Sequence, residues 1–333
     1  MRLVMVGTGE FALPTFRRLI EITRSGSDAE AAGGSHEIVA LLTQPDRTGP
    51  GKHNHPHPMK ELAEQHGIPV LQPLQCNAPE SIAALRGLEA DLMVVAAYGQ
   101  ILSAEFLTTT RLGAVNLHAS LLPKYRGAAP IQYAVWMGES ETGVTIFQIQ
   151  PRLDAGPILG VVRTPIGPKE TAGELEVRLA DLGAELALEV VRDLAQGTTR
   201  PVTQDSAGVT KAPKMPKLAG LIDWSKPTRE IGWHLRAMQP WPMPFTFLHV
   251  AGRPPMRLLI LDADLAEPIG SAPAAPGTVV HSDGRQLHVR TGDGVAAILR
   301  LQASGKRPMG IDEFLRGNSV PIGSRFGAES LEV

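Results

Sequence analysis

Short apolar runs rich in β-branched residues alternate with segments of helical periodicity in the first half of the chain. The apolar runs, taken as strands, are residues 2–6, 36–44, 90–99, 113–120 and 143–150. The segments in which apolar residues recur every three or four positions, taken as helices, are 14–24, 58–66, 79–87, 128–137 and 171–197. Strands that are apolar almost throughout are buried on both faces. This alternation therefore predicts an α/β fold with a doubly wound, mostly parallel sheet of the Rossmann-like type.

The pattern changes near residue 197. Residues 198–216 contain three prolines and no hydrophobic periodicity, so we expect them to link an N-terminal domain of residues 1–197 to a C-terminal domain of residues 217–333. In the second part, a helix over 227–239 precedes several short strands separated by turns such as Ser-Asp-Gly-Arg. Short strands with frequent turns predict a smaller antiparallel β-barrel, similar to an OB fold.

Cys76 is the only cysteine among the 333 residues, so no disulfide can form within the chain. A single thiol suits a reducing compartment. No apolar run approaches the roughly 20 residues needed to span a membrane, and the apolar N-terminal stretch is too short for a signal peptide. We therefore expect a cytoplasmic protein without a membrane partner, and we expect a monomer.

The formal net charge is −2, and this small value alone indicates no anionic partner. The distribution is uneven, however, because residues 198–333 hold 16 Lys and Arg against 12 Asp and Glu, whereas residues 1–197 hold 16 against 22. The concentration is strongest over 211–257, with eight basic residues and two acidic ones. This stretch is either an ordinary solvated surface or a binding surface for an anionic partner such as nucleic acid.

The first predicted strand runs into Gly7-Thr8-Gly9, the beginning of a G-x-G-x-x-A sequence. In dinucleotide-binding folds this turn holds a pyrophosphate, and an acidic residue about 20 positions later binds the ribose. The only candidate acid at the end of the second strand, Asp46, lies 37 residues beyond Gly9. Pro14 also removes a backbone N–H from the first helical turn, where a phosphate would bind. NAD binding is therefore the weaker interpretation of this turn.

Asn116 and His118 stand two residues apart at the end of the predicted strand over 113–120. Side chains alternate along a strand, so these two point to the same face, at the carboxyl edge where open α/β sheets bind ligands. An amide and an imidazole that converge on one point can stabilise a developing oxyanion. Asp154 follows in a Gly- and Pro-rich loop, and a carboxylate near His118 would favour its imidazolium and relay a proton.

Motifs along the chain resemble those of a known family over nearly the whole length. They are GTGEFALP, TQPDR, VVAAYGQIL, NLHASLLPKYRGAAPIQ, ETGVTIFQI and LDAGPIL in the first part, and LIDW, QPWPMPF and GTVV in the second. On these motifs the chain is similar to the methionyl-tRNA formyltransferases, a family of folate-dependent formyltransferases. The resemblance implies a transferase of translation initiation, with 10-formyltetrahydrofolate as formyl donor and the α-amino group of methionyl-initiator-tRNA as acceptor.

The resemblance also assigns roles to individual residues. The family's catalytic residues correspond to Asn116, His118 and Asp154. Its folate-contacting residues are expected at Ala97, Tyr98, Gly99, Gln100, Ile101, Leu102, Ser120, Leu121, Leu122, Pro123 and Gly143. The formyl group arrives on the co-substrate, so no metal is expected, and no metal-ligand spacing includes His118.

Basic residues are expected to bind the phosphates of the tRNA. The assigned residues are Arg47, Lys52, Lys211, Lys214, Lys217, Arg236 and Lys306. The chain departs from the family in the loop of residues 48–60, where members carry an Arg- and Lys-rich stretch. Here the loop contains His53, His55 and His57 among prolines. Partly protonated histidines could bind RNA phosphate, and a metal site is the less favoured alternative.

Three alternatives remain open. The first is a sugar-nucleotide N-formyltransferase, which uses the same donor and shares the fold and the catalytic set. The second is a non-catalytic RNA-binding protein on a degenerate enzyme fold, and the third is the dinucleotide-dependent oxidoreductase suggested by Gly7-Thr8-Gly9. The GAAPIQ sequence and the basic stretch over 211–257 favour a tRNA acceptor.

Overall fold

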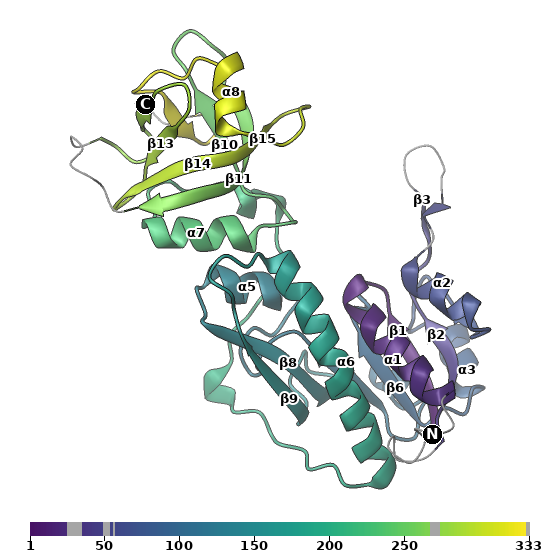
Figure 1. Ribbon diagram of the computed structural model, residues 1–333. Helices are drawn as coiled ribbons and strands as arrows, with labels where there is room; N and C mark the ends of the chain where they lie inside the picture. The colour runs from purple at the N-terminus through teal and green to yellow at the C-terminus, as the bar shows by residue number, and fades with distance from the viewer. Residues whose placement is uncertain (25–34, 49–53, 56, 267–273, 331–333) are drawn as a thin grey trace. The chain divides into compact units, whose positions relative to one another are not determined.

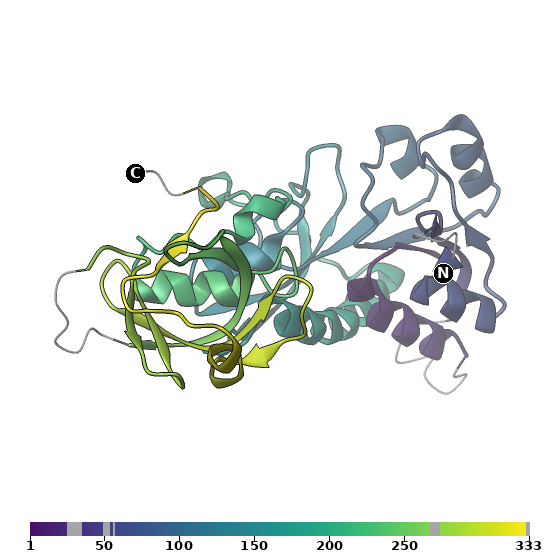
Figure 2. The ribbon, with the colours of Figure 1, turned by 90° about the horizontal axis from the view of Figure 1, so that it is seen from above.

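The computed structural model describes residues 1–24, 35–48, 54–55, 57–266 and 274–330. The chain forms two compact units, each with its own sheet. The first consists of residues 1–130, 141–165 and 175–213, and the second of residues 131–140, 166–174 and 214–333. The helices and strands of both units are drawn in Figures 1 and 2.

The first unit is built on a seven-stranded sheet in the order β5-β2-β1-β6-β7-β8-β9. The strands are β1 (Arg2–Gly7), β2 (Glu37–Leu42), β5 (Val70–Leu71), β6 (Leu92–Ala96), β7 (Ala114–His118), β8 (Glu141–Gln148) and β9 (Ile158–Pro165). The first five strands in this order are parallel, whereas β8 and β9 run antiparallel to their neighbours. The predicted mostly parallel sheet is confirmed. Outside it, β3 (Arg47–Thr48) pairs with β4 (Asn54–His55).

Helices cover both faces of this sheet (Figures 1 and 2). The helices of this unit are η1 (Glu10–Ala12), α1 (Leu13–Arg24), α2 (Pro58–Gln65), α3 (Pro79–Arg86), α4 (Ala104–Leu107) and α6 (Ala172–Gln196), with the short η2 (Ser206–Gly208) after them. On one face, α1 and α6 are joined by an ion pair in which Arg18 Nε lies 2.8 Å from Glu185 Oε1. On the other face, α3 and α4 pack on apolar side chains of β1 and β6 such as Val4 and Val95.

The direction in which strands are added reverses between β1 and β6. The chain passes from β1 outward to β2 and β5, then returns to β6 and continues to β7 on the other side. In open α/β sheets this reversal marks a ligand site at the carboxyl ends of the strands. A Cβ on Gly7, at the end of β1, would fall 2.6 Å from the carbonyl oxygen of Ala96, so only glycine fits there. Because β1, β6 and β7 are parallel, the loops that follow these three strands begin at the same edge of the sheet.

The second unit is an antiparallel sheet in the order β12-β13-β14-β11-β10-β16, with β15 paired to β14. Its elements are α5 (Pro130–Trp136), η3 (Lys217–Gly220), α7 (Thr228–Ala237), β10 (Phe245–His249), β11 (Met256–Ala266), β12 (Val279–Ser282), β13 (Leu287–Arg290), β14 (Val295–Ala303), β15 (Met309–Gly310), α8 (Ile311–Gly317) and β16 (Arg325–Gly327). A bridge between Thr278 and Arg325 brings the two outer strands together. The sheet is thus nearly closed, and the predicted small antiparallel barrel is confirmed. Among the described residues, no helix has both the length and the apolar composition that crossing a membrane requires.

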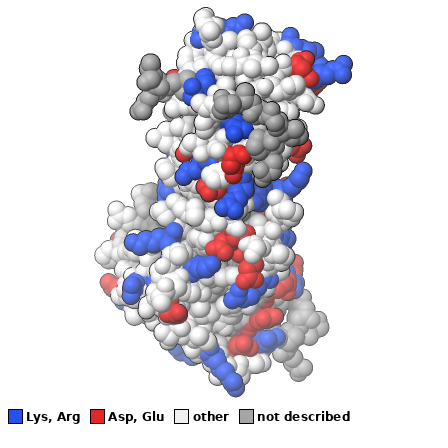
Figure 3. Space-filling view, turned by 90° about the vertical axis from the view of Figure 1, so that its left-hand side faces the viewer, with Lys and Arg blue, Asp and Glu red and all other residues white. Residues whose placement is uncertain are grey.

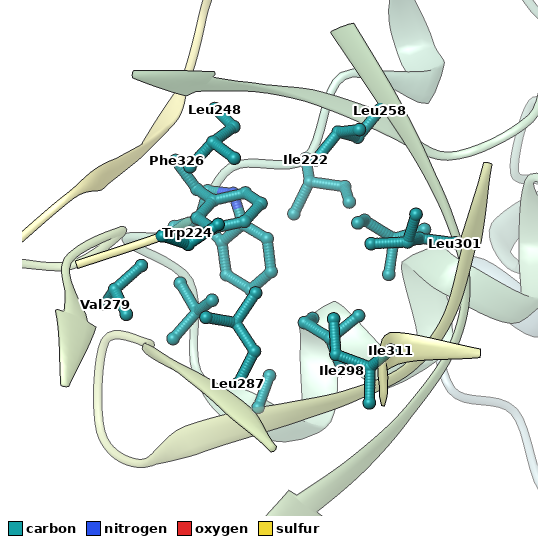
Figure 4. Close-up of a cluster of buried hydrophobic side chains, with 14 of the residues drawn as sticks. Ile222, Trp224, Leu248, Leu258, Val279, Leu287, Ile298, Leu301, Ile311 and Phe326 are labelled. Carbon is teal, nitrogen blue, oxygen red and sulfur yellow. The ribbon is translucent and has the colours of Figure 1, made fainter. Parts of the chain in front are cut away.

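The barrel encloses a core of apolar side chains, shown in Figure 4. The labelled residues are Ile222, Trp224, Leu248, Leu258, Val279, Leu287, Ile298, Leu301, Ile311 and Phe326. Trp224 packs edge to face on Phe326, with ring centroids 5.8 Å apart. Its Nε1–H donates to Thr246 Oγ1 at 3.0 Å, so the polar edge of the indole is satisfied inside the core.

Replacing Phe326 with alanine is expected to lower the free energy of unfolding by about 3–5 kcal/mol, because the ring is 2% exposed and its loss leaves a cavity. Urea unfolding of the full chain, followed by tryptophan fluorescence, measures the change. Ile322→Ala in the same unit is the control, since that side chain is 66% exposed and its truncation is expected to change stability by less than about 0.5 kcal/mol. Equal losses in the two variants would contradict the assignment of the core.

Candidate active site

The end of β7 presents two polar side chains to the same face of the first unit's sheet. Asn116 and His118 occupy alternate positions of the strand and pair in register with Phe147 and Thr145 of β8. Leu117, between them, points to the opposite face and contacts α6. The long helix therefore covers the face of the sheet away from Asn116 and His118.

His118 is buried, with 6% of its side chain exposed. Its Nε2–H donates to the carbonyl oxygen of Tyr125 at 2.9 Å, so in the neutral ring the lone pair lies on Nδ1. Burial lowers the pKa of His118, and the nearby Asp154 carboxylate opposes this effect without outweighing it. From the sequence we expected Asp154 to hold an imidazolium. Burial instead favours the neutral ring, because desolvation penalises the charged form more than the carboxylate favours it.

Asp154 lies in the loop between β8 and β9, with its Oδ2 atom 3.9 Å from Nδ1 of His118. This distance is too long for a direct hydrogen bond, so the two groups interact through charge. The same oxygen accepts the N–H of Gly127 at 2.8 Å, which orients the carboxylate. Asp154 has a φ of 46°, a left-handed conformation that costs a non-glycine residue of order 1 kcal/mol or more. Neighbouring contacts must therefore hold this residue in place.

The loop after β7 folds back over the end of the strand. Ser120 is held twice, since its Oγ donates to the backbone carbonyl four residues later at 2.7 Å and its own carbonyl accepts from Thr145 Oγ1 at 2.7 Å. On β8, a Cβ on Gly143 would fall 2.6 Å from Leu121 Cδ2 and 2.0 Å from a backbone oxygen, so glycine is required there. The folate-contact candidates 120–123 and Gly143 therefore form one cluster beside the catalytic candidates.

The loop after β6, residues 97–102, contains the remaining folate-contact candidates. Tyr98 and Leu102 are buried in the core of the unit, whereas Ile101 is 80% exposed. The backbone turns sharply at Gly99, which has a φ of 84°. The loop thus offers its backbone and Ile101 to a ligand, while two of the predicted contact residues direct their side chains inward.

Side-chain amides join the loops that follow β2 and β6. Gln44 Nε2 donates to the carbonyl of Tyr98 at 3.0 Å, and Gln100 Nε2 donates to Gln44 Oε1 at 3.2 Å. Gln100 Oε1 accepts the N–H of Cys76 at 3.0 Å. The predicted contact residue Gln100 therefore uses its side chain within the protein. The sequence analysis did not predict the contribution of Gln44, because a single polar residue after a strand belongs to no recognisable motif or spacing.

The carboxylate of Asp46 is occupied by partners within the first unit. Lys60 Nζ lies 2.5 Å from its Oδ2, and Gln72 Nε2 donates to its Oδ1 at 3.0 Å. These contacts lower the pKa of Asp46, chiefly through the hydrogen bond from Lys60. An acid held in this way is not available for ribose hydroxyls, which counts against the dinucleotide alternative.

The segment 202–212, which the sequence pattern assigned to a linker, makes hydrogen bonds with the loop after β7. Thr210 Oγ1 accepts the N–H of Tyr125 at 2.8 Å, and Gln204 Oε1 accepts from the Arg126 guanidinium at 2.6 Å. Sequence reasoning missed Gln204 and Thr210 as site residues. Prolines and the lack of periodicity indicate a connection, and isolated polar residues within it carry no signal of what they contact.

The basic residues predicted to bind tRNA differ in their availability. Those exposed to solvent are Lys211, Lys214, Lys217 and Lys306. Arg236 is half-buried, and its Nη1 donates to the carbonyl oxygens of Glu170 at 3.0 Å and Gly167 at 3.4 Å. Burial also lowers its pKa. On the face drawn in Figure 3, Lys and Arg side chains are interspersed with Asp and Glu, so that face carries no unbroken basic field.

In the histidine-containing loop of residues 48–60, the structure describes residues 48, 54–55 and 57–60. Arg47 begins β3, whose backbone pairs with that of His55 in β4. Lys52 and His53 lie outside the described residues. Within the residues that are described, no three His, Cys, Asp or Glu side chains are grouped so that they could hold a metal ion.

Comparison with known proteins matches both parts of the chain. Residues 1–191 match the family described as "Formyl transferase", and residues 214–319 match "Formyl transferase, C-terminal domain". The methionyl-tRNA formyltransferase of Methylococcus capsulatus is 43% identical over 328 residues, which cover 98% of this chain and 100% of that protein. The protein of the same name from Citrifermentans bemidjiense is 41% identical over 334 residues, which cover 100% and 98%.

A solved structure shares the fold at much lower identity. It is WlaRD, a sugar 3N-formyl transferase determined in the presence of dTDP and 5-N-formyl-THF. The likeness has a TM-score of 0.63 at 17% identity and covers 92% of this chain and 99% of that one. At this identity the comparison supports the architecture of the chain and not its acceptor.

Proposed function

This chain belongs to the methionyl-tRNA formyltransferase family, and on that premise we propose that it transfers the formyl group of 10-formyltetrahydrofolate to the α-amino group of methionyl-initiator-tRNA. The observation that carries the proposal is the grouping of Asn116, His118 and Asp154 at the carboxyl edge of the sheet. An amide donor, a buried imidazole and a carboxylate are the groups that formyl transfer between two nitrogen atoms requires.

The chemistry begins when the neutral α-amino group attacks the formyl carbon. A new N–C bond forms, the carbonyl π electrons move to the oxygen, and the Asn116 amide donates a hydrogen bond to the resulting oxyanion. His118 Nδ1 accepts the proton that the amine loses, and as an imidazolium it also faces the oxyanion. The bond between the formyl carbon and the folate nitrogen then breaks. His118 returns the proton to that nitrogen, so the enzyme ends unchanged.

Asp154 stabilises the imidazolium that exists between these two proton transfers. Its Oδ2 lies 3.9 Å from Nδ1 of His118, and a negative charge at that distance favours the protonated ring. Because burial lowers the pKa of His118, the resting ring is neutral and ready to accept a proton. The carboxylate then reduces the free-energy cost of the charge that forms during the reaction.

The two substrates are assigned to different parts of the chain. The pterin ring is proposed to bind at the loop 97–102 and at the cluster formed by 120–123 and Gly143, mainly through backbone groups. The C-terminal domain, residues 217–333, is proposed to bind the tRNA, whereas residues 1–197 perform the chemistry. The proposed phosphate contacts are Arg47, Lys52, Lys211, Lys214, Lys217, Arg236 and Lys306, which makes the affinity fall as salt rises. The protein is proposed to act in the cytoplasm as a monomer.

The choice of acceptor is tested by supplying 10-formyltetrahydrofolate with either methionyl-initiator-tRNA or a 4-amino-sugar nucleotide. We expect formylation of the aminoacylated tRNA alone, detected by base hydrolysis and mass analysis of the released amino acid. Uncharged initiator tRNA is the control for the acceptor group. Formylation of the sugar nucleotide but not of the tRNA would overturn the proposed acceptor while leaving the donor in place.

A further inference from the structure

Gln204, in the segment after α6, makes four hydrogen bonds with one side-chain amide. Its Nε2 donates to the carbonyl oxygens of Asp154 at 2.9 Å and Gly156 at 2.8 Å. Its Oε1 accepts from Nε and Nη2 of Arg126 at 3.2 Å and 2.6 Å. The residue is 8% exposed, so water competes little for these groups. Both amide hydrogens and both oxygen lone pairs are used, which fixes the orientation of the amide.

The donor half of this amide holds the loop that carries Asp154. The left-handed backbone of Asp154, with a φ of 46°, relaxes to a more common conformation unless contacts prevent it. The N–H of Gly127 holds the carboxylate, whereas Gln204 holds the backbone of the same residue and of the position two further on. Together these bonds fix the point from which the carboxylate reaches His118.

The acceptor half of the amide holds the guanidinium of Arg126. This cation lowers the pKa of His118, so it lies within electrostatic reach of the histidine. Burial lowers the pKa of Arg126 itself, and the neighbouring Arg152 cation adds to the effect. Arg126 thus senses one neighbouring cation, Arg152, and one carboxylate, Asp154, and these three groups together carry an excess of positive charge. This excess suits the phosphate group next to the aminoacylated end of a tRNA.

We propose that Gln204 is a positioning residue with two separable effects on formyl transfer. Its donor half sets Asp154 against His118 and so governs kcat. Its acceptor half directs Arg126 toward the terminal phosphate of the acceptor and so governs KM for the tRNA. This inference rests on the proposed function, and it makes the segment after α6 a part of the active site.

Three variants separate the two effects. Gln204→Glu keeps an oxygen for Arg126 but loses both N–H donors, whereas Gln204→Met loses all four hydrogen bonds at similar volume. Arg126→Met removes the guanidinium alone. The matched control is Gln148→Met, a half-buried glutamine of β8 whose Nε2 donates to the carbonyl of Leu112 at 2.9 Å. Its neighbour on the strand, Phe147, pairs with Asn116, so Gln148 points to the face away from the catalytic pair.

Steady-state kinetics with 10-formyltetrahydrofolate and methionyl-tRNA gives the readout. Gln204→Glu is expected to lower kcat about 100-fold at unchanged KM for the tRNA, because a misplaced catalytic group is costly. Above the acid limb of the pH profile, Arg126→Met is expected to raise that KM about tenfold at unchanged kcat, and Gln204→Met to show both changes. Removing or releasing the Arg126 cation also raises the pKa of His118. The acid limb of the profile of kcat against pH is therefore expected to shift to higher pH in Arg126→Met and in Gln204→Met.

The proposal is overturned if Gln204→Glu keeps the wild-type kcat. It is also overturned if every variant loses activity only in proportion to its loss of unfolding free energy, with no difference between the effects on kcat and on KM. Gln148→Met reports that generic loss. Failure of the proposed function has a different signature, since the wild-type protein would then formylate a sugar nucleotide and not the tRNA. In that case the kcat of Gln204→Glu with the sugar acceptor still tests the donor half.

Discussion

Replacing His118 with alanine is expected to lower kcat for formyl transfer by at least about a thousandfold, because the variant lacks the group that we propose to accept and return the reaction proton. The side chain is 6% exposed and stands 3.9 Å from the Asp154 carboxylate, so water cannot replace it at the same place. Binding of methionyl-tRNA is expected to remain nearly intact, since the proposed phosphate contacts are basic residues elsewhere. Single-turnover formylation and filter binding measure the two effects.

The pH dependence of wild-type kcat adds a check on the same residue. The proposed mechanism requires a neutral His118, and burial lowers the pKa of that ring. Activity is therefore expected to be full near pH 7 and to fall only as the pH drops through a value below about 6.5, the ordinary pKa of histidine. His281→Ala is the control, since that side chain is 43% exposed on β12. Wild-type turnover in His118→Ala would refute the catalytic role.

Asp154→Asn is expected to lower kcat by about 10²- to 10³-fold while KM for both substrates changes little. The amide has the size of the carboxylate, and its oxygen can still accept the N–H of Gly127, which Asp154 Oδ2 accepts at 2.8 Å. The negative charge is lost, and with it the stabilisation of the imidazolium. Steady-state kinetics across pH 5 to 8 measures the variant.

The direction of the pH shift in Asp154→Asn is fixed by the charge that is removed. The carboxylate raises the pKa of His118 against the effect of burial, so its loss lowers that pKa further. The acid limb of kcat is expected to move to lower pH even as kcat itself falls. Asp205→Asn is the control, because Asp205 in the same unit caps η2 by accepting the N–H of Ala207 at 2.9 Å. A shift of the limb to higher pH would contradict the proposed electrostatics.

The spacing of hydrophobic residues predicted those helices and strands in which buried positions recur at a regular interval along the chain. The segment 171–197 became α6, Ala172–Gln196; the apolar run at 2–6 lies within β1, and the run at 90–99 contains β6. Elements outside the prediction are short or lie at a sheet edge. β9 carries Gly160 and Pro165 and has alternate exposed positions, while β16 has three residues. An edge strand is held by its hydrogen bonds to one neighbouring strand and does not need to be apolar throughout. Its sequence therefore lacks the apolar run by which buried strands are recognised.

The candidate site likewise has one part that the sequence predicted and one part that it did not. The shared face of Asn116 and His118 follows from the two-residue period of a strand, and this period is a property of the local backbone. The approach of Asp154 to His118 is not local, since it depends on the pairing of β8 with β7 and on a loop that turns back from β8. Spacing in the chain does not report such a distance. The family motifs named these residues, but only the fold brings them within 3.9 Å.

The sequence by itself determined a two-part α/β and barrel protein, its family, and an Asn-His pair at the end of a buried strand. These rest on periodicity and on motif order, which are local properties of the chain. Tertiary structure decided two further points. It lowered the pKa of His118, because the burial of one ring depends on every loop packed around it. It also turned the expected linker into a support for Asp154 and Arg126 through Gln204, because hydrogen bonds between residues 50 and 78 positions apart are decided by the folded chain.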